Sequence, residues 1–136
     1  MAPPIKEEKK FMEAYRSYRS NMIAIGRSEN TVENIDNVIK LFSLFMIEDR
    51  DNWNHEVSFT DIQAWRDMLL ATGRKPSTVK QYLKVLSGFY EYASSPQLGD
   101  YRFYDKNPVS KFLMPDTRQE DARPYDQILT DEQAAL

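Results

Sequence analysis

The sequence lacks cysteine and contains one histidine and only four glycines among 136 residues. Without cysteine there is no disulfide framework, no thiolate metal site and no cysteine nucleophile, which also fits a reducing compartment. With one histidine, a metal site would need carboxylates, and Asp49, Asp51 and Asp61 lack the frame of a cation-binding loop. No phosphate-cradling glycine loop is present either. We therefore expect no metal and no cofactor.

Long hydrophobic runs are also missing. No apolar stretch approaches the roughly 18 residues that a membrane-spanning helix requires. The first ten residues have no apolar core and no cleavage site, so they do not read as a signal peptide. We expect a cytoplasmic protein without membrane contact. The formal net charge is −3, so any binding to a polyanion must come from local clusters of basic residues.

What the chain does contain favours one helical domain. Its length fits a single domain, and seven Phe, eight Tyr and two Trp supply apolar surface for a core. Apolar residues recur at steps of three and four, which is typical of amphipathic helices. The pattern predicts an all-α fold with four main helices and a short fifth one. Their expected ranges are about 6–25, 29–47, 61–72, 76–93 and 107–112.

Glycine and hydroxyl residues mark where these helices stop and start. Gly26 and Gly73 follow apolar stripes at positions where a left-handed residue ends a helix. Ser28 is expected to cap the second helix, Thr60 and Gln63 to form a capping box for the third, and Pro76, Ser77 and Thr78 to open the fourth. Asn107 and Pro108 are expected to open the fifth.

The apolar stripes also predict the core. The first two helices contribute Phe11, Tyr15, Tyr18, Met22, Ile25, Val32, Ile35, Val38, Ile39, Phe42, Phe45 and Met46. The next two contribute Ile62, Trp65, Met68, Leu69, Val79, Tyr82, Leu83, Leu86, Phe89, Tyr90 and Ala93. Side chains expected to pack onto this core from loops are Trp53, Val57, Tyr101, Phe103 and Tyr104. His55 is expected to be an ordinary loop residue.

The segments that flank the helical domain, residues 6–113, have a different composition. Residues 1–5 read as a disordered lead. Residues 114–128 contain two prolines and mixed charges without an apolar period, which predicts a linker. Residues 129–136 resemble a capped helix start, and we expect them to begin a further domain.

The helix expected at 76–93 combines a core stripe with the most cationic helix start in the chain. Between Asp67 and Glu91 there is no acidic residue, whereas Arg74, Lys75, Lys80 and Lys84 all fall in this interval. The positive end of a helix with basic and hydroxyl side chains favours an anion, and a phosphate backbone is the leading candidate. An ordinary solvated helix face is the alternative.

The opening of this helix occurs twice in the chain. Residues 26–32 read Gly-Arg-Ser-Glu-Asn-Thr-Val, and residues 73–79 read Gly-Arg-Lys-Pro-Ser-Thr-Val. Two such helix starts can present matched N-termini to neighbouring phosphate tracks. Common helix punctuation is the alternative, and it explains the glycines and threonines but not the arginines.

In order and spacing, five segments together resemble the N-terminal core-binding domain of the tyrosine recombinase, or phage integrase, family. They are Ser-Glu-Asn-Thr-Val-Glu-Asn-Ile (28–35), Leu-Phe-Ser-Leu-Phe (41–45), residues 76–92, Asn-Pro-Val (107–109) and Leu-Thr-Asp-Glu-Gln (129–133). The resemblance covers about residues 8–136. It implies a four-helix, SAM-like bundle (lambda-integrase-like) that forms half of a clamp on double-stranded DNA, in support of DNA integration and recombination. It further implies a catalytic domain after the linker and a homotetramer on DNA for the full-length protein, with this chain alone a monomer.

The resemblance also implies which residues bind DNA, since the starts of the second and fourth helices face it in that family. The matching positions in the second helix are Arg27, Ser28, Asn30, Thr31 and Asn34. Those in the fourth are Arg74, Lys75, Ser77, Thr78, Lys80, Gln81 and Lys84. Glu29 and Glu33 depart from the cationic surface that the resemblance implies for the second helix, whereas the start of the fourth helix has no acidic residue.

The family's cleavage chemistry is missing from this chain. It uses a tyrosine nucleophile, two arginines, a lysine and a His-x-x-Arg element, but His55 is followed three positions later by Ser58. Tyr82, Tyr90 and Tyr92 have helical spacing and are expected in the core or at its rim. We therefore expect no catalytic residue here, although the parent protein would be an enzyme. The alternative function is a helical protein–protein interaction module that docks a partner through residues 101–104.

Overall fold

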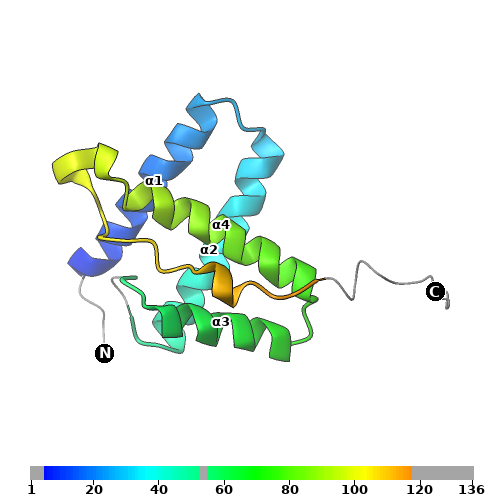
Figure 1. Ribbon diagram of the computed structural model, residues 1–136. Coiled ribbons are helices and arrows are strands. Elements are labelled where there is room, and N and C mark those ends of the chain that lie inside the picture. The colour runs from blue at the N-terminus through cyan, green and yellow to red at the C-terminus, as the bar shows by residue number, and fades with distance from the viewer. Residues whose placement is uncertain (1–4, 53–54, 118–136) are drawn as a thin grey trace, which may run out of the picture.

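The computed structural model describes residues 5–52 and 55–117, and within them it is all-helical, with four α-helices and two short 3-10 helices (Figure 1). The α-helices are α1 (Ile5–Ala24), α2 (Glu29–Glu48), α3 (Phe59–Ala71) and α4 (Pro76–Ala93). The 3-10 helices are η1 (Pro96–Tyr101) and η2 (Lys111–Leu113). The expected all-α fold and its four main helices are confirmed.

The central element is α4, against which α1, α2 and α3 all pack. Figure 1 shows it crossing the middle of the molecule, with the α1–α2 turn above and α3 below. Its buried residues follow the helical period, so one continuous stripe meets the three neighbours. They are Val79, Leu83, Leu86, Phe89, Tyr90 and Ala93.

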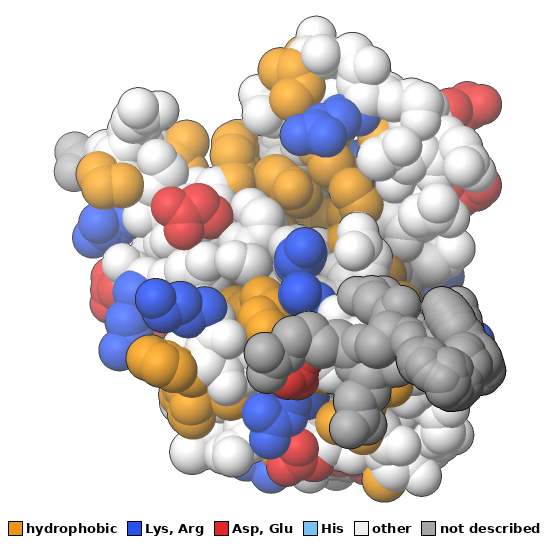
Figure 2. All heavy atoms as spheres, turned by 45° about the vertical axis from the view of Figure 1, so that its right-hand side comes forward, with side chains coloured by type: hydrophobic (Ala, Val, Ile, Leu, Met, Phe, Trp, Pro, Cys, Tyr) orange, Lys and Arg blue, Asp and Glu red, His pale blue; other side chains and the backbone are white. Residues whose placement is uncertain are grey.

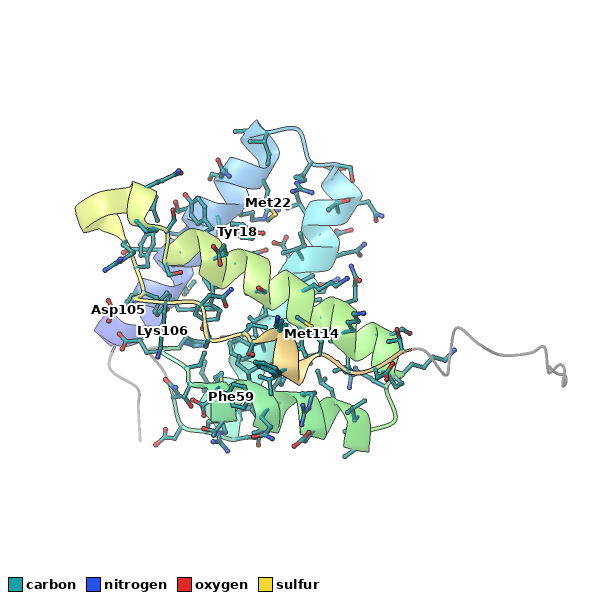
Figure 3. The ribbon with its side chains drawn as sticks, viewed as in Figure 1. Tyr18, Met22, Phe59, Asp105, Lys106 and Met114 are labelled. Atoms are coloured by element: carbon teal, nitrogen blue, oxygen red, sulfur yellow. The ribbon has the colours of Figure 1, made fainter. Side chains whose placement is uncertain are left out.

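Gly88 lies where α4 is close to α1. A Cβ atom at this position would lie 3.0 Å from the hydroxyl oxygen of Tyr18, so a larger residue would require the Tyr18 side chain to shift. Figure 3 shows Tyr18 and Met22 on the side of α1 that faces its neighbours. The ring of Tyr18 meets Phe89 edge to face at a centroid distance of 5.8 Å. Aromatic contacts thus join the first helix to the central one.

The predicted core is confirmed for most positions of the four stripes, with one clear error at Ile25. Its side chain is 62% exposed. The reason is local, because α1 ends at Ala24 and Gly26 adopts a φ of +94°, which turns the chain away from the stripe. A second group of predicted core residues is only half-buried and forms the rim: Tyr15, Tyr18, Ile35, Met68 and Tyr82.

The capping box predicted for α3 is wrong. The helix begins at Phe59 and Ser58 is its N-cap, so Thr60 lies in the first turn and Gln63 at the start of the second. The Ser58 hydroxyl accepts from the Asp61 N–H, and the Asp61 carboxylate accepts from the Ser58 N–H at 3.0 Å. This reciprocal pair satisfies two otherwise free donors. In α4, Pro76 occupies the first turn as expected, but the N-cap is Lys75, whose side chain makes no cap hydrogen bond.

The predicted helix at 107–112 is also wrong, since only Lys111–Leu113 is helical there, as a single 3-10 turn. Asn107 does not cap a helix. Its amide nitrogen donates to the Ser87 hydroxyl at 3.0 Å, while its side-chain oxygen accepts from the Val109 N–H at 3.0 Å. The side chain therefore ties the C-terminal segment to α4. The turn η1, within the segment expected to be a loop, was not predicted.

His55 lies in a loop, as expected, but its side chain is fully buried. Its ring stacks on Phe11 at a centroid distance of 3.8 Å, and its Nε2 lies 2.9 Å from the hydroxyl of Ser43. The Tyr90 hydroxyl donates to its carbonyl oxygen at 2.6 Å. His55 therefore joins the loop before α3 to three helices.

The loop side chains that were expected to pack onto the core do so where the structure describes them. Val57 and Phe103 are half-buried against the core, and Tyr104 is buried. Trp53, the side chain of Tyr101, most of the expected lead and residues 118–136 lie outside the described part of the chain. The expected further domain and most of the expected linker fall in that last range.

Candidate nucleic-acid interface

The turns before α2 and α4, where the sequence repeat lies, have the same backbone geometry. After α1, the N–H of Gly26 donates to the Ile23 carbonyl at 3.1 Å and the N–H of Arg27 donates to the Met22 carbonyl at 3.0 Å. This pair of bonds is a Schellman cap, and the φ of +94° at Gly26 is the left-handed conformation that such a cap requires. Arg27 is thus held directly before the N-cap of α2, which is Ser28.

The turn between α3 and α4 repeats this arrangement. The N–H of Gly73 donates to Leu70 at 3.1 Å, the N–H of Arg74 donates to Leu69 at 3.2 Å, and Gly73 has a φ of +97°. Arg74 then precedes the N-cap Lys75. The sequence repeat is therefore also a structural repeat, with an arginine at the same position before each helix.

A shared groove joins the two helices. It has a volume of about 610 Å³, and its walls come from Arg27 and the first half of α2 on one side and from the second and third turns of α4 on the other. In Figure 1 both helices begin on the right-hand side, and Figure 2 brings that side forward to show Lys and Arg side chains around a hollow with a hydrophobic floor. The lining residues are Arg27, Thr31, Asn34, Ile35, Asn37, Val38, Gln81, Tyr82 and Val85.

The acidic residues of α2 do not line this groove, although Glu33 lies near its edge. None of the residues that line it, within the described chain, is acidic. A helix turns by about 100° per residue, which places Glu33 about 140° and Glu29 about 180° around the helix from Val38 on the groove floor. Glu29 therefore lies opposite the groove floor, whereas Glu33 lies one turn before Asn37, beside the edge of the groove.

The basic candidates are not neutralised by described carboxylates. The ion pairs among the described residues use five other basic side chains: Lys10, Arg19, Arg50, Arg66 and Arg102. None of the candidate cations on α2, on α4 or before them takes part in these pairs. Among the described residues, these cations therefore have no carboxylate partner within 4.0 Å.

Arg74 is positioned by an aromatic stack. Its guanidinium carbon lies 5.9 Å from the ring centre of Tyr82, within the range of a cation–π contact. Tyr82 in turn stacks on Trp65 at a centroid distance of 6.2 Å. An Arg74 Nη1–H also donates to the Thr72 hydroxyl at 3.0 Å. Because Tyr82 lines the groove, this stack holds a cation close to it.

The structure brings four of the twelve predicted DNA-binding residues around the groove: Arg27, Thr31, Asn34 and Gln81. The outward face of α4 carries Ser77 and Lys84, which are exposed, and Lys80, which is half-buried. Lys84 lies about 60° around the helix from Gln81, and Lys80 about 100°. The other predicted residues occupy the two helix starts: Ser28, Asn30, Arg74, Lys75 and Thr78.

The sequence interpretation missed Asn37 and the apolar floor of the groove. Asn30, Asn34 and Asn37 recur at steps of four and three, which places them on one exposed stripe of α2. That spacing was visible in the sequence. The apolar floor could not be recognised in the sequence, because Ile35, Val38 and Val85 follow the same helical period as the core residues beside them.

The tyrosines predicted to lie in the core or at its rim do so. Tyr90 is buried, whereas Tyr82 and Tyr92 are half-buried. Burial raises the pKa of Tyr90 well above its usual value, and its hydroxyl is used in the hydrogen bond to His55. Burial also raises the pKa of Tyr18, an effect that the nearby positive charge of Arg27 partly offsets. An activated nucleophile would need a lowered pKa or an adjacent base.

Within the described ranges, no group of three or more His, Cys, Asp or Glu side chains is arranged to hold a metal ion. No helix in the same ranges is long and apolar enough to cross a bilayer. In comparisons with known proteins, the chain matches no family model, no curated protein and no solved structure.

Proposed function

We propose that this chain is a DNA-binding domain, of the core-binding type found in site-specific tyrosine recombinases, and that it forms half of a clamp on duplex DNA. The observation that carries the proposal is the groove between α2 and α4, lined by Arg27 and Thr31 from the first repeated helix start and by Gln81 just after the second, with no acidic side chain among its described lining residues. The resemblance of residues 28–35 and 76–92 to that family supports the same function.

The surface fits a duplex because it combines groups that can contact phosphates with polar side chains that can contact bases. Arg27, Arg74 and Lys84 supply charge for phosphates, and backbone N–H groups at the two helix starts supply further donors. The polar side chains Thr31, Asn34 and Gln81 lie among them. Binding by several phosphate contacts is strongly salt-dependent, and with a net charge of −3 it must come from a local cluster of basic residues such as this one.

Under this proposal the chain binds DNA and performs no cleavage itself. Catalysis belongs to a separate domain in the full-length protein, which would act in the cytoplasm as a homotetramer on DNA. The SAM-like arrangement of the four helices is part of the same proposal. Binding in this chain would hold the duplex in register for that domain.

The test is DNA binding measured by fluorescence anisotropy with a labelled random-sequence duplex of about 30 base pairs, from 25 to 200 mM salt. With about four phosphate contacts, the logarithm of the binding constant should fall with the logarithm of salt concentration at a slope of about −3.6. Arg27→Glu combined with Lys84→Glu removes one cation from each side of the groove. We expect at least tenfold weaker binding and a slope that is shallower by about 1.8.

A matched control has the same change in net charge on another surface. Arg16 and Lys40 are exposed, and Lys40 lies about 160° around α2 from Val38. Arg16→Glu combined with Lys40→Glu should bind almost as well as the unmodified chain. Equal losses in the two double variants would mean that only net charge matters and that the assigned face is wrong.

A protein-interaction module is the second candidate, favoured by a groove of about 530 Å³ between α1 and α2. Its lining is mainly apolar and includes Met12 and Leu44, which are about half exposed. The loop originally expected to dock a partner is less suited to that role, since Tyr104 is buried. A chain that binds no DNA at low salt but self-associates, with Leu44→Glu abolishing the association, would support this function instead.

A further inference from the structure

Carboxamide side chains lie on both walls of the groove between α2 and α4. Asn34 and Asn37 come from α2, and Gln81 faces them from α4. All three are exposed, so their amides are accessible from outside. Asn30 extends the stripe by one turn toward the helix start. The groove thus presents amides above an apolar floor.

This combination matches the major-groove edge of an A·T base pair. A carboxamide has a donor and an acceptor in one plane, and adenine presents the complementary N7 acceptor and N6 donor. The paired thymine presents a methyl group, for which Ile35, Val38 and Val85 provide apolar contact. The carboxylate that would accept from the N4 amino group of cytosine is missing from the described lining residues.

Helix stability does not explain the asparagine stripe. Asparagine is among the poorer helix formers, because its side chain competes for backbone hydrogen bonds. Three of them nevertheless occupy exposed positions of α2, where lysine, glutamate or alanine would favour the helix. The same positions line or border the candidate DNA surface, so their amides have a use outside the helix.

We propose that Asn34, Asn37 and Gln81 are sequence-reading residues that select A·T base pairs in the major groove, while the surrounding cations contact phosphates without regard to sequence. This inference rests on the proposed DNA-binding function and adds to it the residues that set specificity. The ligand in the test is duplex DNA, whose bases these residues would contact in the major groove.

The experiment selects bound sequences from a randomised duplex library and compares the unmodified chain with an Asn34→Ala, Asn37→Ala, Gln81→Ala triple variant. The unmodified chain should enrich A·T pairs at two or more neighbouring positions. Each bidentate amide contact should discriminate by about 5- to 150-fold. In the triple variant the enrichment should fall to within about twofold of random. Alanine is a better helix former, so loss of the fold does not explain the change.

A phosphate-contact variant provides the control. Lys84→Ala should weaken binding to all sequences and make the salt slope shallower by about 1, with the A·T preference unchanged. If the unmodified chain binds duplex DNA without A·T preference, or if the preference survives in the triple variant, the inference is overturned and the DNA-binding function stands. If it binds no duplex at low salt, both are overturned.

Discussion

Tyr90 anchors the loop before α3 to the central helix, and replacing it by phenylalanine tests this anchor. The side chain is 1% exposed, and its hydroxyl donates to the buried His55 at 2.6 Å. Phenylalanine keeps the ring contacts with Phe42 and Phe89, at centroid distances of 6.3 and 4.9 Å, so little cavity forms. Removal of a donor to a buried carbonyl costs about 1–3 kcal/mol. We expect the free energy of unfolding to fall by that amount.

The assay is urea unfolding followed by far-ultraviolet circular dichroism. With an m value of about 1.5 kcal/mol/M, a loss of about 2 kcal/mol lowers the midpoint by about 1.3 M. Tyr82→Phe is the matched control, because it removes a hydroxyl from a half-buried ring on the same helix. Its effect should stay within about 0.5 kcal/mol.

A Tyr90→Phe midpoint equal to that of the unmodified chain would refute this reasoning. The loop would then be held by the stacking of His55 on Phe11 rather than by the hydrogen bond. Equal losses in Tyr90→Phe and Tyr82→Phe would refute it too, because burial of the hydroxyl would then make no difference.

Four further predictions concern pH, capping and helix propensity. Because burial raises the pKa of Tyr90, above about pH 10 the unfolded chain releases a proton that the folded state keeps. The free energy of unfolding should therefore fall by about 1.4 kcal/mol per pH unit from this group. Urea titrations at stepped pH should show a shallower fall in Tyr90→Phe. Lys75→Ser adds the missing N-cap and should raise stability by about 1 kcal/mol while making the DNA salt slope shallower by about 1. Gly73→Ala places a Cβ in open space at a φ of +97°, so the backbone alone should cost about 1–2 kcal/mol in the same unfolding assay. Asn37→Ala should raise the free energy of unfolding slightly, by up to about 0.7 kcal/mol, because it removes only a poor helix former.

Local patterns predicted the helices because their causes are local. The stripe Val79, Leu83 and Leu86 follows the helical period, and this period arises from backbone bonds four residues apart. Gly26 and Gly73 marked two helix ends because the left-handed cap conformation costs glycine little. These features need no knowledge of the remaining chain.

Choices between similar local signals were made by packing. Thr60 was predicted to cap α3, but the helix begins at Phe59, so Ser58 forms the capping box with Asp61. Asn107 read as a helix cap, but its amide binds Ser87 on α4, twenty positions earlier. His55 read as an ordinary loop residue, and its burial depends on partners from three helices.

The sequence alone determined the chemistry of the candidate interface: a basic residue, a glycine stop and a hydroxyl at each of two helix starts. Only the tertiary structure decided that Asn34 and Asn37 from α2 line one groove together with Gln81 from α4. The physical reason is that helical periodicity is encoded within a few residues, whereas the angle between α2 and α4 is set by side chains that are distant in sequence and meet only in the core.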